Sequence, residues 1–191
     1  HGVMLLKCCL NGTRSRSDHP ACPTTPQELA RDASAVTAAG AMALHVHPRD
    51  AEGIEALDGR SIGEAISAIR ETVTVPVGVS TGAWILPEAR DRLRAIEEWE
   101  VLPDFASVNF NESGATDVAR LLADRGVGVE AGLWHEDAAA VLADSGLGDR
   151  CLRILIEPME QTVDGALANV GRIEQRLAGV AVNVTRLLHG Y

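Results

Sequence analysis

The chain has 191 residues, 46% of them hydrophobic, which is enough for one domain with a sizeable core. A formal net charge of -10 argues against nucleic acid or an anionic membrane surface as the main partner. There is no signal peptide and no apolar run of about 18 residues, and the four cysteines show no CxxC spacing, so we expect a cytoplasmic protein with reduced thiols.

Apolar runs and helical patterns alternate along the chain. Val3–Leu10 is expected to form a buried strand that ends at Asn11-Gly12, and a loop then leads to a helix from Thr25 to about Ala39. A capping-box pattern, Thr25-Pro26-Gln27-Glu28, marks the start of that helix. Further strands are expected at 43–47, 76–80, 105–110, 127–132, 151–157 and 185–190, and further helices at 61–72, 87–99, 116–124, 136–144 and 163–177.

This alternation is typical of an α/β fold with a buried parallel sheet. Nearly every expected strand ends in a polar residue, which favours a (β/α)8 TIM-type barrel, where such ends converge on one mouth. A doubly wound sheet would place a glycine-rich phosphate turn after its first strand, and Asn11-Gly12-Thr13-Arg14 does not match that pattern. We predict a single barrel domain over residues 1–191, with seven recognisable strands and the eighth missing from this chain.

The second expected strand carries the strongest chemical signal. His45 and His47 alternate with Leu44 and Val46, so both imidazoles point to one face of the strand, just before Pro48 ends it. Two imidazoles on one face are a ready pair of ligands for a first-row metal. The alternative is a pair of polar histidines that line a barrel interior without a metal.

Other polar residues at strand ends are candidates for ligand contacts. The segment Ser80-Thr81-Gly82 offers two hydroxyl groups and a flexible residue, although all three are also common in turns. Ser107 and Asn109 share one strand face, where polar filling of a barrel layer is the alternative. Glu130 lies on an alternating strand and is expected to point into the barrel. Arg14, Arg16 and His19 form a basic loop, which in an acidic chain suggests an anionic ligand, and a solvated loop is the alternative.

Together these motifs resemble those of the β-keto acid cleavage enzymes. The resemblance covers essentially the whole chain, with the motifs in the correct order. It is carried by Cys9-Leu10-Asn11-Gly12, His19-Pro20 with Pro23-Thr24-Thr25-Pro26, Leu44-His45-Val46-His47-Pro48-Arg49, Gly78-Val79-Ser80-Thr81-Gly82, Ser107-Val108-Asn109-Phe110 and Glu130-Ala131-Gly132.

The resemblance implies a zinc-dependent acyltransferase that takes a small β-keto acid and acetyl-CoA and yields acetoacetate and a new acyl-CoA by a retro-Claisen reaction. It implies His45 and His47 as zinc ligands and Ser80 and Glu130 as catalytic residues. We also expect a homo-oligomer. The substrate-binding residues expected on this basis are Asn11, Arg14, Thr81, Gly82, Ser107 and Asn109.

Two features depart from the family pattern. Members that act on amines carry an acidic residue where this chain has Arg14, so we expect a substrate side chain that is neutral or anionic. Members also end with an eighth strand bearing an Arg-x-Gly-x-Glu-Asp stretch, which supplies an arginine, the third zinc ligand and the base. No such stretch occurs here, so the sequence is a partial record or the protein is catalytically degenerate, and the intact site motifs favour the partial record.

Two other functions stay open at this point. A different metal-dependent barrel, such as a hydrolase or an aldolase, could use the histidine pair together with His135 or His189. A non-catalytic barrel that binds a ligand or serves as the subunit of an oligomer is the third possibility.

Overall fold

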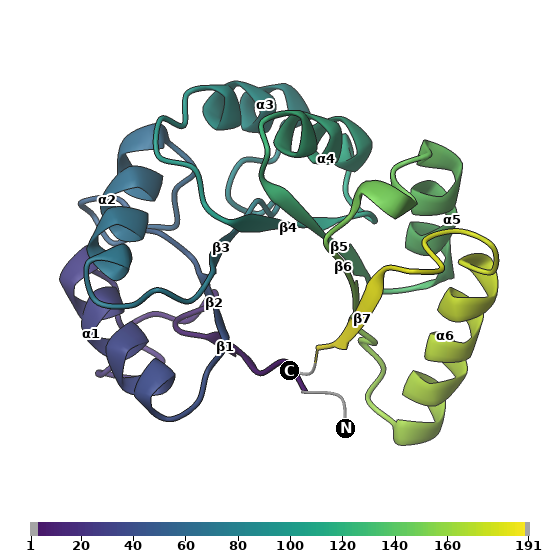
Figure 1. Cartoon of the computed structure of the whole chain (residues 1–191), viewed down its shortest axis with the longest axis horizontal. Coiled ribbons are helices and arrows are strands. Elements are labelled where there is room, and N and C mark those ends of the chain that lie inside the picture. Colours follow the sequence, from purple (N-terminus) through teal and green to yellow (C-terminus); the bar gives the residue numbers. More distant parts are fainter. Residues whose placement is uncertain (1–3, 190–191) are drawn as a thin grey trace. The chain divides into compact units, whose positions relative to one another are not determined.

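The computed structural model describes residues 4–189, which fall into two compact units of alternating strands and helices (Figure 1). Unit 1 consists of the residues up to Ser80 together with Arg94–Phe105. Unit 2 consists of Thr81–Leu93 and the chain from Ala106 onward.

Unit 1 contains three parallel strands and two helices that lie side by side (Figure 1). The middle strand is buried at all four of its positions and is paired on both edges: Cys9 pairs with His45, and His45 pairs with Gly78. The elements in chain order are β1 (Lys7–Cys9), α1 (Pro26–Ala38), β2 (Ala43–Val46), α2 (Gly59–Arg70) and β3 (Val77–Ser80).

Glycine at position 78 makes room for an aromatic side chain in unit 1. A Cβ atom built on Gly78 would lie 2.0 Å from the ring of Phe105. Phe105 is fully buried, so it has little freedom to move away, and a side chain at position 78 would displace it. Gly78 therefore allows the face of the sheet that carries His45 to pack against Phe105.

Unit 2 has the same alternation. Its strands β5 (Gly128–Leu133), β6 (Arg153–Ile156) and β7 (Thr185–Leu188) are paired in parallel, and the helices α5 (Glu136–Ser145) and α6 (Val163–Arg176) pack beside one another (Figure 1). α3 (Ala89–Glu97) begins in unit 2 and ends in unit 1. The remaining elements are β4 (Phe105–Asn109), α4 (Ala115–Asp124) and a 3-10 turn (Gly148–Arg150).

The strand order confirms the predicted fold class. Along the sheet the strands follow one another from β1 to β7 in chain order. A doubly wound sheet reverses its order at a switch point, whereas a TIM-type barrel adds each strand beside the preceding one. The seven predicted strands are therefore those of an α/β barrel fold. The single domain over 1–191 stays a prediction.

The first strand is shorter than predicted. It covers Lys7–Cys9 instead of Val3–Leu10, because its pairing with β2 extends over three positions and the chain turns at Asn11, whose carbonyl accepts a hydrogen bond from the Arg14 amide. Val3 and the predicted last strand residue, Gly190, lie outside the described residues. None of the helices within residues 4–189 combines the length and the hydropathy that a bilayer-spanning helix requires.

The predicted capping box is present at the start of α1. The Thr25 hydroxyl accepts a hydrogen bond from the Glu28 amide, and the Glu28 carboxylate accepts hydrogen bonds from the amides of Thr24 and Thr25. The guanidinium of Arg16 also pairs with Glu28 at 2.5 Å. These contacts satisfy amides that the first helical turn would otherwise leave unpaired.

We expect Glu28→Gln to change how stability depends on pH. The amides of Thr24 and Thr25 and the Arg16 guanidinium lower the pKa of Glu28 from 4.5 to about 2. A lowered pKa stabilises the fold above pH 4.5, and this contribution is lost as the pH falls toward 2. Urea titrations over a pH series should show a loss of about 1 kcal/mol in the variant at neutral pH and a flatter acid limb.

The matched control for this change is Glu64→Gln, which removes an exposed carboxylate paired with Arg60 one turn away on α2. It should leave the acid limb unchanged, because exposed pairs of this kind contribute only about 0.3–0.5 kcal/mol. Equal acid limbs for the wild-type protein and Glu28→Gln would contradict the capping argument.

Candidate functional site

The two histidines of the HxH motif lie in unit 1 at the end of β2, and both are buried. His45 is 7% exposed and His47 is 8% exposed. Their Nε2 atoms are 3.3 Å apart, and the rings meet edge to face at an interplanar angle of 73°. The alternation along the strand thus brings the two imidazoles together on one face, as the sequence predicts.

The spacing of the two nitrogens fits a shared metal ion. Two nitrogens bound to one tetrahedral zinc at about 2.0–2.1 Å lie about 3.3–3.4 Å from each other. The observed Nε2–Nε2 distance of 3.3 Å agrees with that edge of the tetrahedron. Within residues 4–189 there is no group of three or more His, Cys, Asp or Glu side chains that could hold a metal ion, so a metal ion at this site would take two ligands from the pair.

Asn11 holds the backbone of His47 in place. Its side-chain Nδ2 donates to the His47 carbonyl at 2.8 Å, and its Oδ1 accepts from the His47 amide at 2.9 Å. The amide side chain thus takes the place of a peptide group in the strand next to β2. Nδ2 also donates to the carbonyl of Pro23 at 3.3 Å. A substrate contact for Asn11 stays a prediction.

Two more of the predicted residues belong to unit 1. Ser80 is buried. Gly78 is the register partner of His45, and Ser80 lies two residues further along β3, so its side chain lies on the face that carries the histidines. The side chain of Arg14 is exposed, and its carbonyl accepts a hydrogen bond from the guanidinium of Arg49. Catalysis by Ser80 and substrate binding by Arg14 are not tested by these contacts.

Glu55 contacts the histidine pair and was not expected from the sequence. Its Oε2 lies 2.9 Å from Nδ1 of His47, and both side chains are nearly buried. It belongs to the loop between β2 and α2, which contains several acidic residues. A loop has neither strand alternation nor helical periodicity, so the sequence does not show which of these carboxylates faces the histidines. The only sequence signal is its position in the loop that directly follows the HxH motif.

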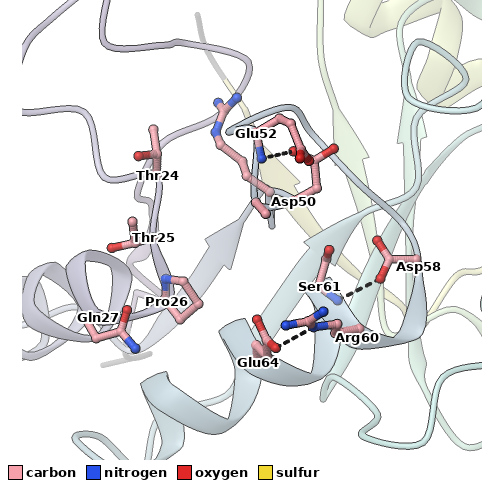
Figure 2. A pocket seen from close by; sticks show the side chains of 12 residues that line it. Thr24, Thr25, Pro26, Gln27, Asp50, Glu52, Asp58, Arg60, Ser61 and Glu64 are labelled. Carbon is pink, nitrogen blue, oxygen red and sulfur yellow. Dashed lines mark hydrogen bonds and ion pairs between the residues drawn. The ribbon is translucent and has the colours of Figure 1, made fainter.

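A hollow of about 490 Å³ lies beside the same loop, between the N-terminal ends of α1 and α2 (Figure 2). Carboxylates outnumber guanidinium groups among its lining side chains, so it does not suit the phosphates of an anionic ligand such as a coenzyme A ester. Several of these carboxylates already have partners: Asp50 accepts from the Glu52 amide, Asp58 caps α2 through the Ser61 amide, and Glu64 pairs with Arg60.

In unit 2, Glu130 is fully buried and forms an ion pair with Arg153. The Arg153 Nε lies 2.9 Å from Glu130 Oε1, and the two residues are direct register partners on β5 and β6. Arg153 was not expected as a site residue, although it is the single charged residue within β6, just as Glu130 is within β5. A catalytic role for Glu130 stays a prediction.

The predicted segment after β3 packs against β4 in unit 2. The Thr81 hydroxyl donates to the Ser107 carbonyl at 2.7 Å, which connects two of the predicted residues. A Cβ on Gly82 would lie 2.1 Å from the ring of Trp84, so glycine here lets the indole pack over the backbone. Ser107 is half-buried. Substrate contacts by these residues stay predictions.

Asn109 is oriented by a carboxylate that the sequence did not single out. Its Nδ2 donates to Glu112 Oε1 at 3.0 Å, and Glu112 Oε2 accepts from the Ala83 amide at 2.8 Å. The side-chain oxygen Oδ1 of Asn109 is therefore the end that faces Gly132. A Cβ atom built on Gly132 would lie 2.6 Å from this oxygen. Glu157 approaches the same glycine and accepts a hydrogen bond from the Trp134 indole at 2.8 Å.

Comparison with known proteins supports the interpretation of these motifs. The family model described as beta-keto acid cleavage enzyme matches residues 4–145, a range that includes every predicted site residue. A 3-keto-5-aminohexanoate cleavage enzyme from Fusobacterium nucleatum is 29% identical over 137 residues, which is 65% of this chain and 50% of that protein. The chain thus spans about half the length of this curated relative.

Solved structures share the fold at low sequence identity. The 3-dehydroquinate dehydratase from Geobacillus kaustophilus HTA426 superposes with a TM-score of 0.64 at 11% identity, over 99% of this chain and 74% of that chain. A mandelate racemase/muconate lactonizing enzyme from Roseiflexus sp. gives a TM-score of 0.60 at 17% identity, over 98% and 48% of the two chains. Similarity at this level shows a common fold and carries no information on activity.

Proposed function

The chain belongs to the beta-keto acid cleavage enzyme family, and from this premise we propose that it binds zinc through His45 and His47 and cleaves a small β-keto acid with acetyl-CoA. The reaction would move the carboxymethyl part of the keto acid onto the acetyl group. The products would be acetoacetate and an acyl-CoA that retains the remaining acyl part of the keto acid. The observation that carries the proposal is the pair of buried Nε2 atoms 3.3 Å apart.

The residues of unit 1 suit the binding of such a substrate. A divalent metal ion at the histidine pair would supply Lewis acidity toward a ketone oxygen. Asn11 fixes the backbone that carries His47, so the ring is placed before any ligand arrives. Ser80, on the same face, would donate its hydroxyl hydrogen to an oxygen of the bound keto acid.

Roles for the residues of unit 2 are proposed on the family resemblance. Thr81, Gly82, Ser107 and Asn109 would contact the substrate, and Glu130 would take part in catalysis. The orientation of Asn109 by Glu112 supports its assignment, because a substrate-binding amide has to present a defined end. We further propose a cytoplasmic homo-oligomer, which size-exclusion chromatography with light scattering would test.

Metal analysis combined with an acyl-transfer assay tests the function. We expect the purified wild-type protein to retain zinc and to form acetoacetate from a β-keto acid only when acetyl-CoA is present. Neutral and acidic keto acids should be better substrates than aminated ones, because Arg14 repels an ammonium group. Zinc binding with CoA-independent turnover would indicate a hydrolase or an aldolase instead. A folded protein with neither zinc nor turnover would contradict the proposal.

A further inference from the structure

The side chain of Glu55 contacts the outer nitrogen of a proposed metal ligand. We propose that Glu55 is a positioning residue that sets the tautomer and the ring orientation of His47, so that Nε2 of His47 presents its lone pair to a metal ion. The inference deepens the proposed function and rests on it. Its basis is the 2.9 Å contact between Glu55 Oε2 and His47 Nδ1.

The chemistry of the two groups determines the direction of this hydrogen bond. An ionised carboxylate only accepts hydrogen bonds, so Nδ1 of a neutral His47 has to carry the hydrogen. Nε2 of the same ring is then the unprotonated nitrogen, and it is the atom that lies 3.3 Å from Nε2 of His45. Neutral imidazole with a free lone pair is the form that binds metals, and a carboxylate behind the ring makes it a stronger ligand.

The loop that carries Glu55 is well ordered by its own contacts. Arg49 and Glu55 form an antiparallel bridge, and the amides of Glu52 and Ile54 both donate to the Asp50 carboxylate. Gly53 has a φ of +81°, which favours glycine at this point of the turn. The loop therefore places the Glu55 carboxylate before a metal binds.

Arg49 ties this loop to the rest of unit 1. Its guanidinium donates to the carbonyl of Gly53 within the loop and to the carbonyl of Gly12 after β1, both at 3.2 Å. Arg49 is itself buried, and both hydrogen bonds are partly buried. Arg49, two residues after His47, thus holds the loop whose Glu55 carboxylate contacts the His47 ring. This is a reason for arginine at position 49 beyond any contact with a ligand.

The inference is tested on the full chain with Glu55→Ala and with Glu55→Gln, which keeps the shape and an acceptor oxygen. Zinc affinity is measured by competition with a chromogenic chelator, and the His47 tautomer of the metal-free protein by ¹⁵N chemical shifts. We expect Glu55→Ala to bind zinc about 10–100-fold more weakly and to lose the Nδ1–H tautomer. Glu55→Gln should retain that tautomer and lose less affinity.

The matched control is Glu52→Ala, which removes an exposed carboxylate from the same loop and leaves the amide that donates to Asp50 intact. It should keep wild-type zinc affinity and tautomer, and circular dichroism should show all variants folded. Wild-type affinity and tautomer in a folded Glu55→Ala would overturn the inference. If the wild-type protein binds no zinc, the proposed function fails, while the tautomer comparison still decides whether Glu55 orients His47.

Discussion

Replacing His45 or His47 by alanine is expected to weaken zinc binding by at least about 100-fold. The loss of a hydrogen-bond partner behind a metal ligand alone costs about 10–100-fold, and these changes remove a ligand itself. Each imidazole contributes one of the two Nε2 atoms that lie 3.3 Å apart. His45→Ala and His47→Ala should also reduce acetoacetate formation to background. Chelator competition measures the affinity, and the acyl-transfer assay measures the activity.

The control for this prediction is His135→Ala, which removes an exposed histidine at the start of α5. It should keep the zinc content and the activity of the wild-type protein. Thermal unfolding of the metal-free proteins separates ligand loss from misfolding, since a variant that has lost only its ligand still unfolds cooperatively. Full zinc occupancy in a folded His47→Ala would exclude this pair as the metal site.

The Arg153→Met variant is expected to lose about 3–5 kcal/mol of unfolding free energy, the range measured when one partner of a buried ion pair is removed. Glu130 is fully buried and Arg153 is nearly so, with 2.9 Å between the paired atoms. The variant keeps the buried carboxylate and takes away the cation paired with it, which leaves the cost of burying that charge poorly compensated. Denaturant titration at neutral pH measures the loss.

Two further variants decide whether the ion pair is the cause. Arg150→Met removes one partner of the exposed pair with Asp124 and should cost no more than about 1 kcal/mol. The double variant Glu130→Leu/Arg153→Met removes both charges and should recover most of the lost stability, because an apolar pair of similar volume replaces them. If Arg153→Met is as stable as the wild-type protein, the pair does not stabilise the fold.

The stability measurements also bear on the predicted catalytic role of Glu130. If the Glu130 carboxylate serves only the fold, Glu130→Gln should lower the activity only as far as it lowers the fraction of folded protein. If Glu130→Gln stays folded at the assay temperature and still loses most of its kcat, the carboxylate acts in the reaction. The comparison is made well below the melting temperature of the variant, so that the folded population is the same.

The order of strands and helices could be predicted because its signals are local. Apolar runs bounded by turn residues mark the strands, and the capping box at Thr25 and Glu28 marks a helix start that the structure confirms. The prediction was less accurate at the ends, as for β1, because strand length depends on how far a neighbouring strand continues to pair.

The sequence by itself determined that His45 and His47 share one face, since alternation along a strand is a property of the backbone. Only the tertiary structure decided what surrounds them and the other predicted residues. Asn11 reaches the His47 backbone from 36 positions away, Glu55 reaches the His47 ring from a loop, and Arg153 meets Glu130 through the register of two strands. These contacts depend on loop closure and strand pairing, which bring distant residues together and leave no periodic trace in the chain.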